Sequence, residues 1–224
     1  MKVLVACEES QTVCKAFRAK GHEAYSCDIQ RCSGGHPEWH ICNDVLDIIN
    51  GNTEFFTCDG TLHIINAWDM IIAHPPCTYL TNTGNRWFNV QRYGDKAIQR
   101  VKSREEAAQF FMAFVNAPCE HIAIENPVGY MSTHYRKADQ IIQPYMFGHE
   151  AEKRTCLWLK NLPALKATNV VKPPERVRFA SGKSMPQWYA DAWHMSSEER
   201  SKFRSKTFQG IAQAMADQWG GYEQ

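Results

Sequence analysis

Short apolar runs that alternate with amphipathic stretches constrain this chain more than any other feature of its sequence. Residues 11–21 and 104–117 carry the apolar spacing of helices that bury one face. Strands are predicted over residues 2–6, 22–28, 40–49 (running into a helical turn), 68–74 and 121–127. Strands and helices that alternate in this way predict an α/β fold with a mostly parallel sheet flanked by helices.

The last third of the chain has a different character. A further strand is predicted over residues 154–160, and a helix begins at Ser196 or Ser197 with acids in its first turn. The segment between that strand and that helix is loop-rich, and a final helix covers 210–219. The expected parts are a core over 1–160, a short insert over 161–202 and a C-terminal helix within 203–224 that packs back on the core.

Charge is unevenly distributed along the chain. The whole chain has a net charge of +1, yet residues 151–206 hold 12 Lys/Arg against 5 Asp/Glu. A basic segment of this kind suits phosphates, and a solvated basic surface without a partner is the alternative. Trp188, Tyr189 and Trp193 in this segment can stack on bases or form a small core. The residues expected to contact nucleic acid are Arg86, Lys153, Arg176, Arg178 and Lys183.

Two further properties bear on the compartment. No apolar run approaches the roughly 20 residues that a membrane span needs, so we expect no membrane contact. The nine cysteines are irregularly spaced and no export signal is evident, which predicts reduced thiols and a cytoplasmic protein. The pattern predicts no particular oligomeric state.

Polar or reactive side chains follow every predicted strand of the core. They are Cys7 and Glu8, then Asp28, Asn43 and Asp44, then His74 and Cys77, and finally Glu125 and Asn126. In parallel α/β sheets, ligands bind beyond the carboxyl ends of the strands. The concentration of acids, a thiol and an amide there predicts a functional site at that edge.

Cys77 follows two prolines, which leave its backbone few conformations. A fixed, partly exposed thiol in a polar setting suits a nucleophile, whereas a small buried hydrophobe is the alternative for any single cysteine here. Glu125, stiffened by Pro127, ends the neighbouring strand and can reach the same substrate. A thiolate that adds to carbon and an acid that protonates a ring nitrogen together activate an electron-poor ring.

Asp28 and Asp44 end the second and third strands. Acids at such positions accept hydrogen bonds from a ribose and from an adenine amino group, with helix capping as the alternative. The first turn, residues 6–12, lacks Gly-x-Gly but offers Glu8, Ser10 and backbone donors at a helix start. It suits a ligand with an amino-acid part better than one with a pyrophosphate.

These motifs resemble those of the DNA (cytosine-5) methyltransferase family, especially its compact phage or prophage members. Pro-Pro-Cys at 75–77 and Glu-Asn-Pro at 125–127 are similar to its PC and EN motifs, in the same order and on matching strands. Arg154 is similar to the arginine of its next motif, and residues 209–216 resemble its last motif. The insert over 161–202 then corresponds to a reduced target-recognition region.

The resemblance implies a Rossmann-like methyltransferase fold that uses S-adenosylmethionine. It implies that Cys77 attacks C6 of a cytosine in DNA, Glu125 engages N3, Arg154 contacts O2 and C5 takes the methyl group. The DNA is single-stranded or duplex, read with short or relaxed specificity. The cofactor contacts it implies, together with those at the strand ends, are Cys7, Glu8, Ser10, Asp28, Ile29, Asp44, Val45, Pro75 and Gln213.

Three alternatives stay open. The short insert also fits the same chemistry on a free cytosine nucleotide, and the unusual first turn fits a relative that binds without catalysis. The sequence His-Pro-Pro-Cys at 74–77 approaches the motif of amino-methyltransferases, although a thiol stands where they have an aromatic ring.

A group of zinc-type donors lies within 16 residues and includes Cys27, Cys32, His36, His40 and Cys42. Their spacings match no known zinc finger, and Cys27 falls inside a predicted strand. We therefore expect no metal site.

Overall fold

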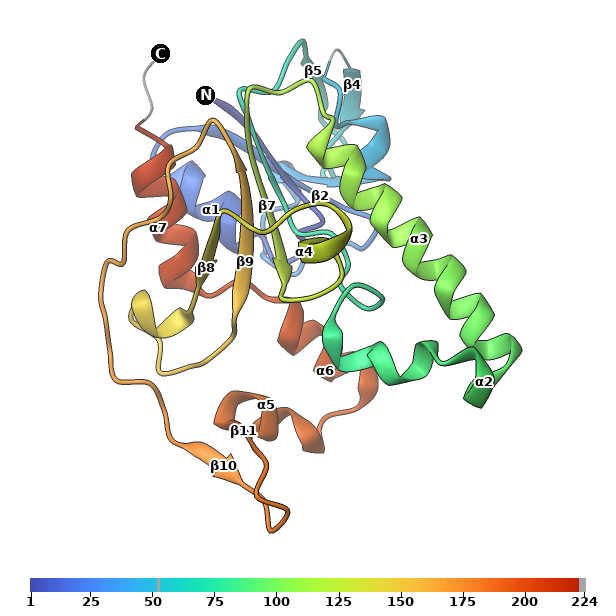
Figure 1. The fold of residues 1–224 in the computed structure, drawn as a ribbon. Helices are drawn as coiled ribbons and strands as arrows, with labels where there is room; N and C mark the ends of the chain where they lie inside the picture. Colours follow the sequence, from blue (N-terminus) through green and yellow to red (C-terminus); the bar gives the residue numbers. More distant parts are fainter. Residues whose placement is uncertain (52, 222–224) are drawn as a thin grey trace.

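A seven-stranded sheet forms the centre of the molecule in the computed structural model, which describes residues 1–51 and 53–221 (Figure 1). Its strands, in spatial order, are β3 (His40–Cys42), β2 (Glu23–Asp28), β1 (Lys2–Ala6), β6 (Met70–Ala73), β7 (His121–Pro127), β9 (Thr155–Lys160) and β8 (Gln140–Ile142). The first five are mutually parallel, while β9 runs antiparallel to both of its neighbours. The prediction of an α/β fold with a mostly parallel sheet is confirmed.

Helices cover both faces of this sheet (Figure 1). On one face, α1 (Thr12–Ala19) and α7 (Gln209–Trp219) pack side by side over a cluster of buried side chains that includes Phe17 and Trp219. On the other face, α3 (Asp95–Val115) and the short α4 (Met131–His134) cover a second cluster. The strand order from β3 to β7 is that of doubly wound folds, so the architecture is compatible with a Rossmann-like fold.

The remaining elements lie outside the sheet. They are β4 (Thr53–Phe56) with β5 (Leu62–Ile65), η3 (Asn82–Phe88), α2 (Val90–Tyr93), β10 (Arg176–Arg178) with β11 (Ser184–Pro186), α5 (Gln187–Asp191) and α6 (Ser197–Ser205). Short 3₁₀ turns are η1 (Pro37–Trp39), η2 (Val45–Asp47), η4 (Pro144–Met146) and η5 (Ala192–His194). In Figure 1, β10, β11, α5 and α6 lie below the edge to which the arrow of β7 points, which is the carboxyl edge of the parallel strands.

The long helix begins earlier than its apolar spacing predicts, at Asp95 instead of residue 104. Its first turns extend beyond the sheet and pack on η3, with Ile98 and Val101 left largely exposed (Figure 1). Only residues that face the sheet carry the apolar repeat, so the pattern marks the packed half of the helix alone.

β9 runs opposite to the other central strands because the segment that joins β8 to β9 is short. Residues 143–154 join β8 to β9 and contain only the turn η4 among regular elements. A parallel connection needs a crossover that carries the chain back along the sheet, and this segment lacks one. The two strands therefore pair antiparallel.

No helix in the described part of the chain has the length and apolar character to cross a bilayer.

Candidate active site

Cys77 lies in a loop that is tied to the end of β7. Asn126, only 2% exposed, donates its side-chain N–H to the carbonyl oxygen of Pro75 over 2.8 Å. The Cys77 carbonyl oxygen in turn accepts hydrogen bonds from the backbone N–H groups of Leu80 and Thr81, both at 3.0 Å. These bonds hold the loop close to β7, and the Cys77 side chain remains exposed.

A second brace joins the segments that follow these two strands. The Tyr130 backbone N–H donates to the Leu80 carbonyl oxygen over 2.7 Å, and Thr81 forms an isolated bridge with Gly129. A Cβ atom added at Gly129 would lie 2.0 Å from that same carbonyl oxygen, so only glycine permits this approach. The loop that carries Cys77 is thus held to β7 and its extension at two points.

Glu125 lies inside the edge of the sheet beside His74. Its Oε2 is 2.9 Å from His74 Nδ1, and the side chains of His74 and Glu125 are 8% and 11% exposed. Burial raises the pKa of Glu125, but the hydrogen bond from His74 and the positive charges of Lys153 and His74 outweigh burial and lower it. The carboxylate is therefore held in its ionised form at neutral pH.

The thiol of Cys77 is close enough to Glu125 to respond to its charge. Desolvation by the surrounding protein raises the pKa of the Cys77 thiol, and the negative charge of Glu125 raises it further. The positive charge of Lys153 lowers it in part. The resting thiol is therefore protonated, and its reactivity depends on cations that approach it. A thiol and a carboxyl group on neighbouring strand ends are the pair required to activate a ring from two sides.

Lys153, and not Arg154, is directed toward this pair. Arg154 is exposed, and the thiol whose pKa its charge lowers is Cys156. Glu125 pairs with Leu157 in the register of β7 with β9, and steps of two residues lead from Leu157 to Lys153. That period of two was the signal in the sequence that could have identified Lys153, which sequence reasoning had assigned to nucleic-acid contact.

The insert contributes a residue that sequence reasoning missed in this role. Burial raises the pKa of Tyr189 on α5, Arg204 on α6 lowers it, and the charges of Cys77 and Glu125 raise it. Tyr189 therefore lies near the Cys77–Glu125 pair. The guanidinium of Arg204 lies 5.0 Å from the Tyr189 ring and donates to the Tyr189 carbonyl oxygen over 3.3 Å.

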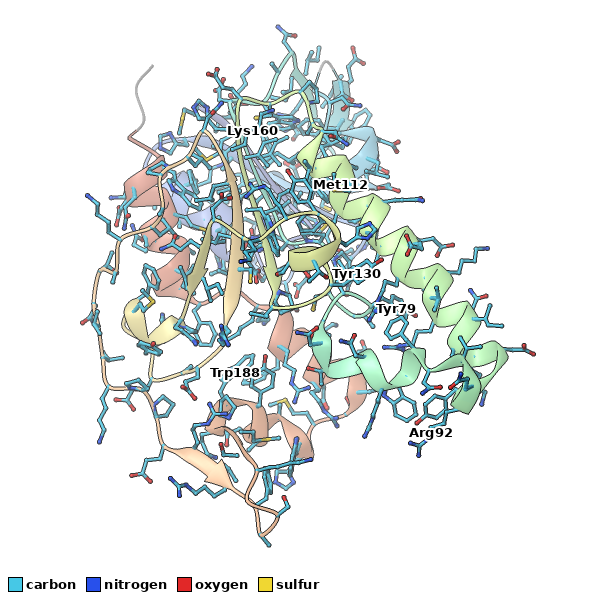
Figure 2. All side chains as sticks on the ribbon, viewed as in Figure 1. Tyr79, Arg92, Met112, Tyr130, Lys160 and Trp188 are labelled. Atoms are coloured by element: carbon cyan, nitrogen blue, oxygen red, sulfur yellow. The ribbon has the colours of Figure 1, made fainter. Side chains whose placement is uncertain are left out.

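The aromatic residues of the insert form a folded unit. Trp188 stacks on Phe203 with ring centroids 5.0 Å apart and lies 5.7 Å from the ring of Phe208. Lys153 Nζ lies 5.8 Å from the Trp188 ring, so the unit contacts the segment before β9. Figure 2 shows Trp188 between the insert and the lower edge of the sheet. Trp193 is 49% exposed and stacks on Phe179 instead.

The predicted nucleic-acid contacts of the insert lie on the hairpin of β10 and β11. Arg176 forms an ion pair with Glu152, whereas Arg178 and Lys183 are exposed. A surface hollow of about 590 Å³ is lined by Arg176 and Arg178 together with Glu175, Gly182 and Ser184. The hairpin thus presents basic side chains, one of which is already paired within the protein.

A second basic element, the basic arm (residues 82–104), begins directly after the Cys77 loop. From Arg86 to Arg104 it holds six basic residues and one acid. Trp87, 42% exposed, packs on Tyr93 with centroids 5.0 Å apart, and Arg86 and Arg92 lie over these rings at 4.6 and 5.4 Å. In Figure 2 the arm carries Arg92 away from the sheet.

Three of the predicted cofactor residues gather on the other side of Cys77. Burial raises the pKa of the Cys7 thiol, and Asp28, Cys27 and Asp44 raise it further, so these groups lie close together. Asp28 accepts a hydrogen bond from the Gln30 backbone N–H, and Asp44 caps η2 through the Leu46 N–H. Both carboxylates thus cap turns, as the capping alternative predicts, yet both residues remain at least partly exposed.

Ile29, next to Asp28, is 78% exposed. An apolar side chain so open to solvent beside a strand-end acid offers a surface for a flat, apolar ring. Val45 is different, because it is 4% exposed and belongs to the core. Pro75 is also buried, and its carbonyl oxygen is taken by Asn126.

The turn after β1 contains no glycine, yet two of its residues adopt the backbone conformation that glycine usually supplies. Cys7 and Gln11 adopt left-handed backbone angles, with φ of 59° and 57°. Gln11 is completely buried and exchanges two hydrogen bonds with the His36 backbone, at 2.8 and 3.0 Å. Glu9 bonds to Ser33 nearby. These contacts hold the strained turn against residues 30–36.

Glu8 is an internal cap of α1. Its carboxylate accepts the backbone N–H groups of Val13 and Cys14 at 2.6 and 3.1 Å, and the residue is 4% exposed. The expectation that backbone donors at this helix start meet a ligand is therefore wrong for these two, because the protein's own carboxylate occupies them. Ser10 bonds to the Thr12 hydroxyl over 3.1 Å.

Gln213 lies apart from the gathered cofactor residues. It is exposed on α7 and donates to Asp217 over 3.0 Å, and Asp217 pairs with Lys20 at the end of α1.

The zinc-type donors serve the fold as well. His40 is fully buried between the Ser26 hydroxyl and the Gln30 carbonyl oxygen, at 2.8 Å each. Over the described ranges, no three potential metal ligands gather.

Comparison of the chain with known protein families and with curated proteins finds no match. The functional assignment therefore depends on the geometry of the site. That geometry brings together Cys77, Glu125, Lys153, Tyr189 and His74, with Cys7, Asp28 and Asp44 beside them.

Proposed function

We propose that this chain is a methyltransferase that transfers a methyl group from S-adenosylmethionine to C5 of cytosine in DNA. The observation that carries the proposal is the closeness of Cys77 to Glu125 at the carboxyl ends of β6 and β7, where the bond from Asn126 to Pro75 braces the loop. The resemblance of the Pro-Pro-Cys and Glu-Asn-Pro motifs to those of DNA (cytosine-5) methyltransferases supports the same chemistry.

The protein's own residues account for ring activation. Cys77 loses its proton to solvent, to which it is exposed, and Lys153 stabilises the resulting thiolate. The sulfur forms a bond to C6, and the electron pair of the C5–C6 double bond moves toward C4, which makes N3 basic. Glu125, ionised in the resting site, takes up a proton and passes it to N3, so that the negative charge is never left on the ring. C5 becomes nucleophilic as a result.

The cofactor side of the site fits the adenosine half of S-adenosylmethionine. Asp28 and Asp44 are carboxylates that accept from hydroxyl or amino groups, and exposed Ile29 offers an apolar face to a purine. When bound, S-adenosylmethionine supplies an electrophilic methyl group to C5. Afterwards the C5 proton leaves to solvent, the C5–C6 double bond re-forms, and Cys77 departs as thiolate.

Charge on both sides of Cys77 favours DNA over a free nucleotide as the substrate. The basic arm begins five residues after Cys77, and the basic hairpin of the insert lies below the same edge of the sheet (Figure 1). A polymer of phosphates can engage both elements at once, whereas one nucleotide cannot. On duplex DNA the cytosine must also leave the stack, which costs a few kcal/mol.

The test uses methyl-labelled S-adenosylmethionine with two substrates, an oligonucleotide that contains 5-fluorocytosine and free dCMP. Fluorine at C5 cannot leave as a proton, so the covalent complex accumulates. The expected result is a denaturation-resistant adduct with the oligonucleotide that wild type and Cys58→Ala form and Cys77→Ala does not. Cys58 is a suitable control because it is exposed as Cys77 is.

Each other result has a defined meaning. Labelled dCMP without labelled DNA would establish the free-nucleotide alternative. Methylated DNA from Cys77→Ala at the wild-type rate would point to amino-group transfer. Neither adduct nor labelled product from wild type would leave a protein that binds without catalysis.

A further inference from the structure

We infer that His74 is the source of the proton that reaches N3 of the substrate, and that Glu125 relays it. The inference rests on the proposed function, because it assigns the proton of that same reaction. His74 Nδ1 lies 2.9 Å from Glu125 Oε2, which leaves Oε1 as the carboxylate oxygen for a substrate. Such a histidine belongs to this chain's own sequence, directly before Pro75.

Two carboxyl groups lie close to His74. Glu8, from the turn after β1, is 4% exposed; burial raises its pKa, and the charge of His74 is the largest of the effects that oppose burial. Glu125, from β7, is the second carboxylate, and Lys153 is the cation that faces it from the segment before β9. His74 thus lies at hydrogen-bond distance from the Glu125 carboxylate and close enough to Glu8 to act on its carboxyl group.

The other titratable groups at the pair are Cys77 and Tyr189. Cys77 approaches from the loop after β6, and Tyr189 approaches from α5 of the insert. Both are neutral when protonated, so neither can carry an extra proton. His74 is therefore the group in the described cluster that can carry an extra proton and share a hydrogen bond with Glu125.

The second nitrogen of His74 supports this assignment. Nε2 is buried and has no hydrogen-bond partner among the described residues. A histidine placed only for structure normally has both ring nitrogens satisfied, as His40 has through Ser26 and Gln30. In His74 the one engaged nitrogen is the one that points at Glu125, which suits transfer along that bond.

The proton balance of the relay closes without a further reactant. As sulfur bonds to C6, the proton on His74 Nδ1 moves to the Glu125 carboxylate, and the carboxylic acid so formed delivers a proton to N3. His74 becomes neutral and Glu125 remains ionised. When Cys77 leaves C6, N3 returns its proton by the same path, and His74 is positively charged again.

The experiment follows exchange of the C5 hydrogen of cytosine with deuterated solvent, in the absence of any cofactor. Addition of Cys77 and protonation of N3 make C5 exchange, so this readout reports ring activation alone. Wild type should lose exchange on the alkaline side, where the relay proton is gone. His74→Asn keeps a donor to Glu125 but carries no transferable proton, and should slow exchange about 10²-fold and remove the alkaline limb.

Controls separate proton transfer from folding and binding. His194→Asn, at an exposed histidine of the insert, should exchange as wild type does. DNA affinity of His74→Asn should stay close to wild type, and a cooperative thermal transition should show that the variant is folded. If His74→Asn does not fold, the wild-type profile decides, since a rate independent of pH on the alkaline side overturns the relay.

Failure of the relay and failure of the proposed function give different results. A His74→Asn protein with the wild-type rate and pH profile overturns the relay, while the fluorocytosine adduct on Cys77 still stands. Wild type without exchange and without adduct overturns both.

Discussion

At the scale of single residues, the pKa values of two carboxyl groups near His74 are shifted in opposite directions. Glu8 is enclosed and accepts two backbone N–H groups, and burial is the dominant effect, which raises its pKa. Glu125 is also enclosed, but the hydrogen bond from His74 and the nearby positive charges lower its pKa. The difference follows from the partners, since backbone donors are neutral and those of Glu125 include charged groups.

The lowered pKa of Glu125 predicts a specific loss of stability in acid. A carboxylate whose pKa is depressed in the folded state stabilises the fold above its unfolded pKa of about 4.3, and that contribution disappears as pH falls through the folded value. Glu125→Gln should therefore lower the free energy of unfolding by about 1–3 kcal/mol at pH 7. The difference from wild type should shrink steadily below about pH 4.

Thermal unfolding between pH 3 and 7 measures this difference. Glu106→Gln is the matched control, because Glu106 is exposed on α3, and its curve should follow that of wild type. A gap between Glu125→Gln and wild type that stays constant across the range would contradict the prediction.

At the scale of elements, the reactive loop owes its position to backbone contacts more than to its own side chains. Asn126 holds Pro75, and the Tyr130 N–H holds Leu80, so β7 and its extension carry the loop after β6. Gly129 allows the closest of these approaches. The strands thus set the separation between Cys77 and Glu125.

Gly129→Ala should disturb the site without touching any side chain in it. The added Cβ would lie 2.0 Å from the Leu80 carbonyl oxygen and force the two segments apart. We expect a loss of about 1–3 kcal/mol in unfolding free energy and a larger proportional loss of adduct formation. Gly221→Ala, where an added Cβ meets nothing within 4 Å, should match wild type in both measurements. Equal adduct rates for the two variants would show that the brace is unimportant.

The sequence predicted those elements whose local pattern matches their environment. The strand over 121–127 has the same bounds as β7, and Glu199, one of the two acids after Ser196, forms the capping box of α6 with it. What it could not predict depends on distant partners. Glu125 and His74 are 51 residues apart in sequence, and no local periodicity reports their hydrogen bond. The sequence predicts a ligand contact for Glu8 because its true partners are two backbone N–H groups, and such partners leave no signature in the sequence.

At the scale of the whole molecule, charge is arranged on either side of the carboxyl edge. The basic arm projects on one side, where Figure 2 shows Arg92 far from the sheet, and the hairpin of β10 and β11 lies below. Lys160 lies at the opposite end of the molecule in the same view. A near-neutral chain thus carries basic residues on two separate elements, the arm and the hairpin, outside the sheet.

This arrangement predicts DNA binding that weakens steeply with salt. The logarithm of affinity should fall with the logarithm of salt concentration by about 0.9 for each duplex phosphate contacted. Arg86→Ala and Arg92→Ala should each reduce that slope by about one, whereas Lys160→Ala should leave it unchanged. Fluorescence anisotropy over a salt series measures the slopes. A wild-type slope near zero would count against DNA and in favour of a free nucleotide.

The contact between α1 and α7 also governs when the fold can close. Val13 and Phe17 near the amino terminus share one buried cluster with Met215 and Trp219, and the Trp219 indole donates to the Pro163 carbonyl oxygen over 3.0 Å. During translation, one side of α1 therefore stays uncovered until α7 has been synthesised and has emerged from the ribosome. The nascent chain carries an apolar surface throughout that interval, and holdase chaperones recognise surfaces of this kind. Closure of this cluster therefore depends on the emergence of α7 from the ribosome.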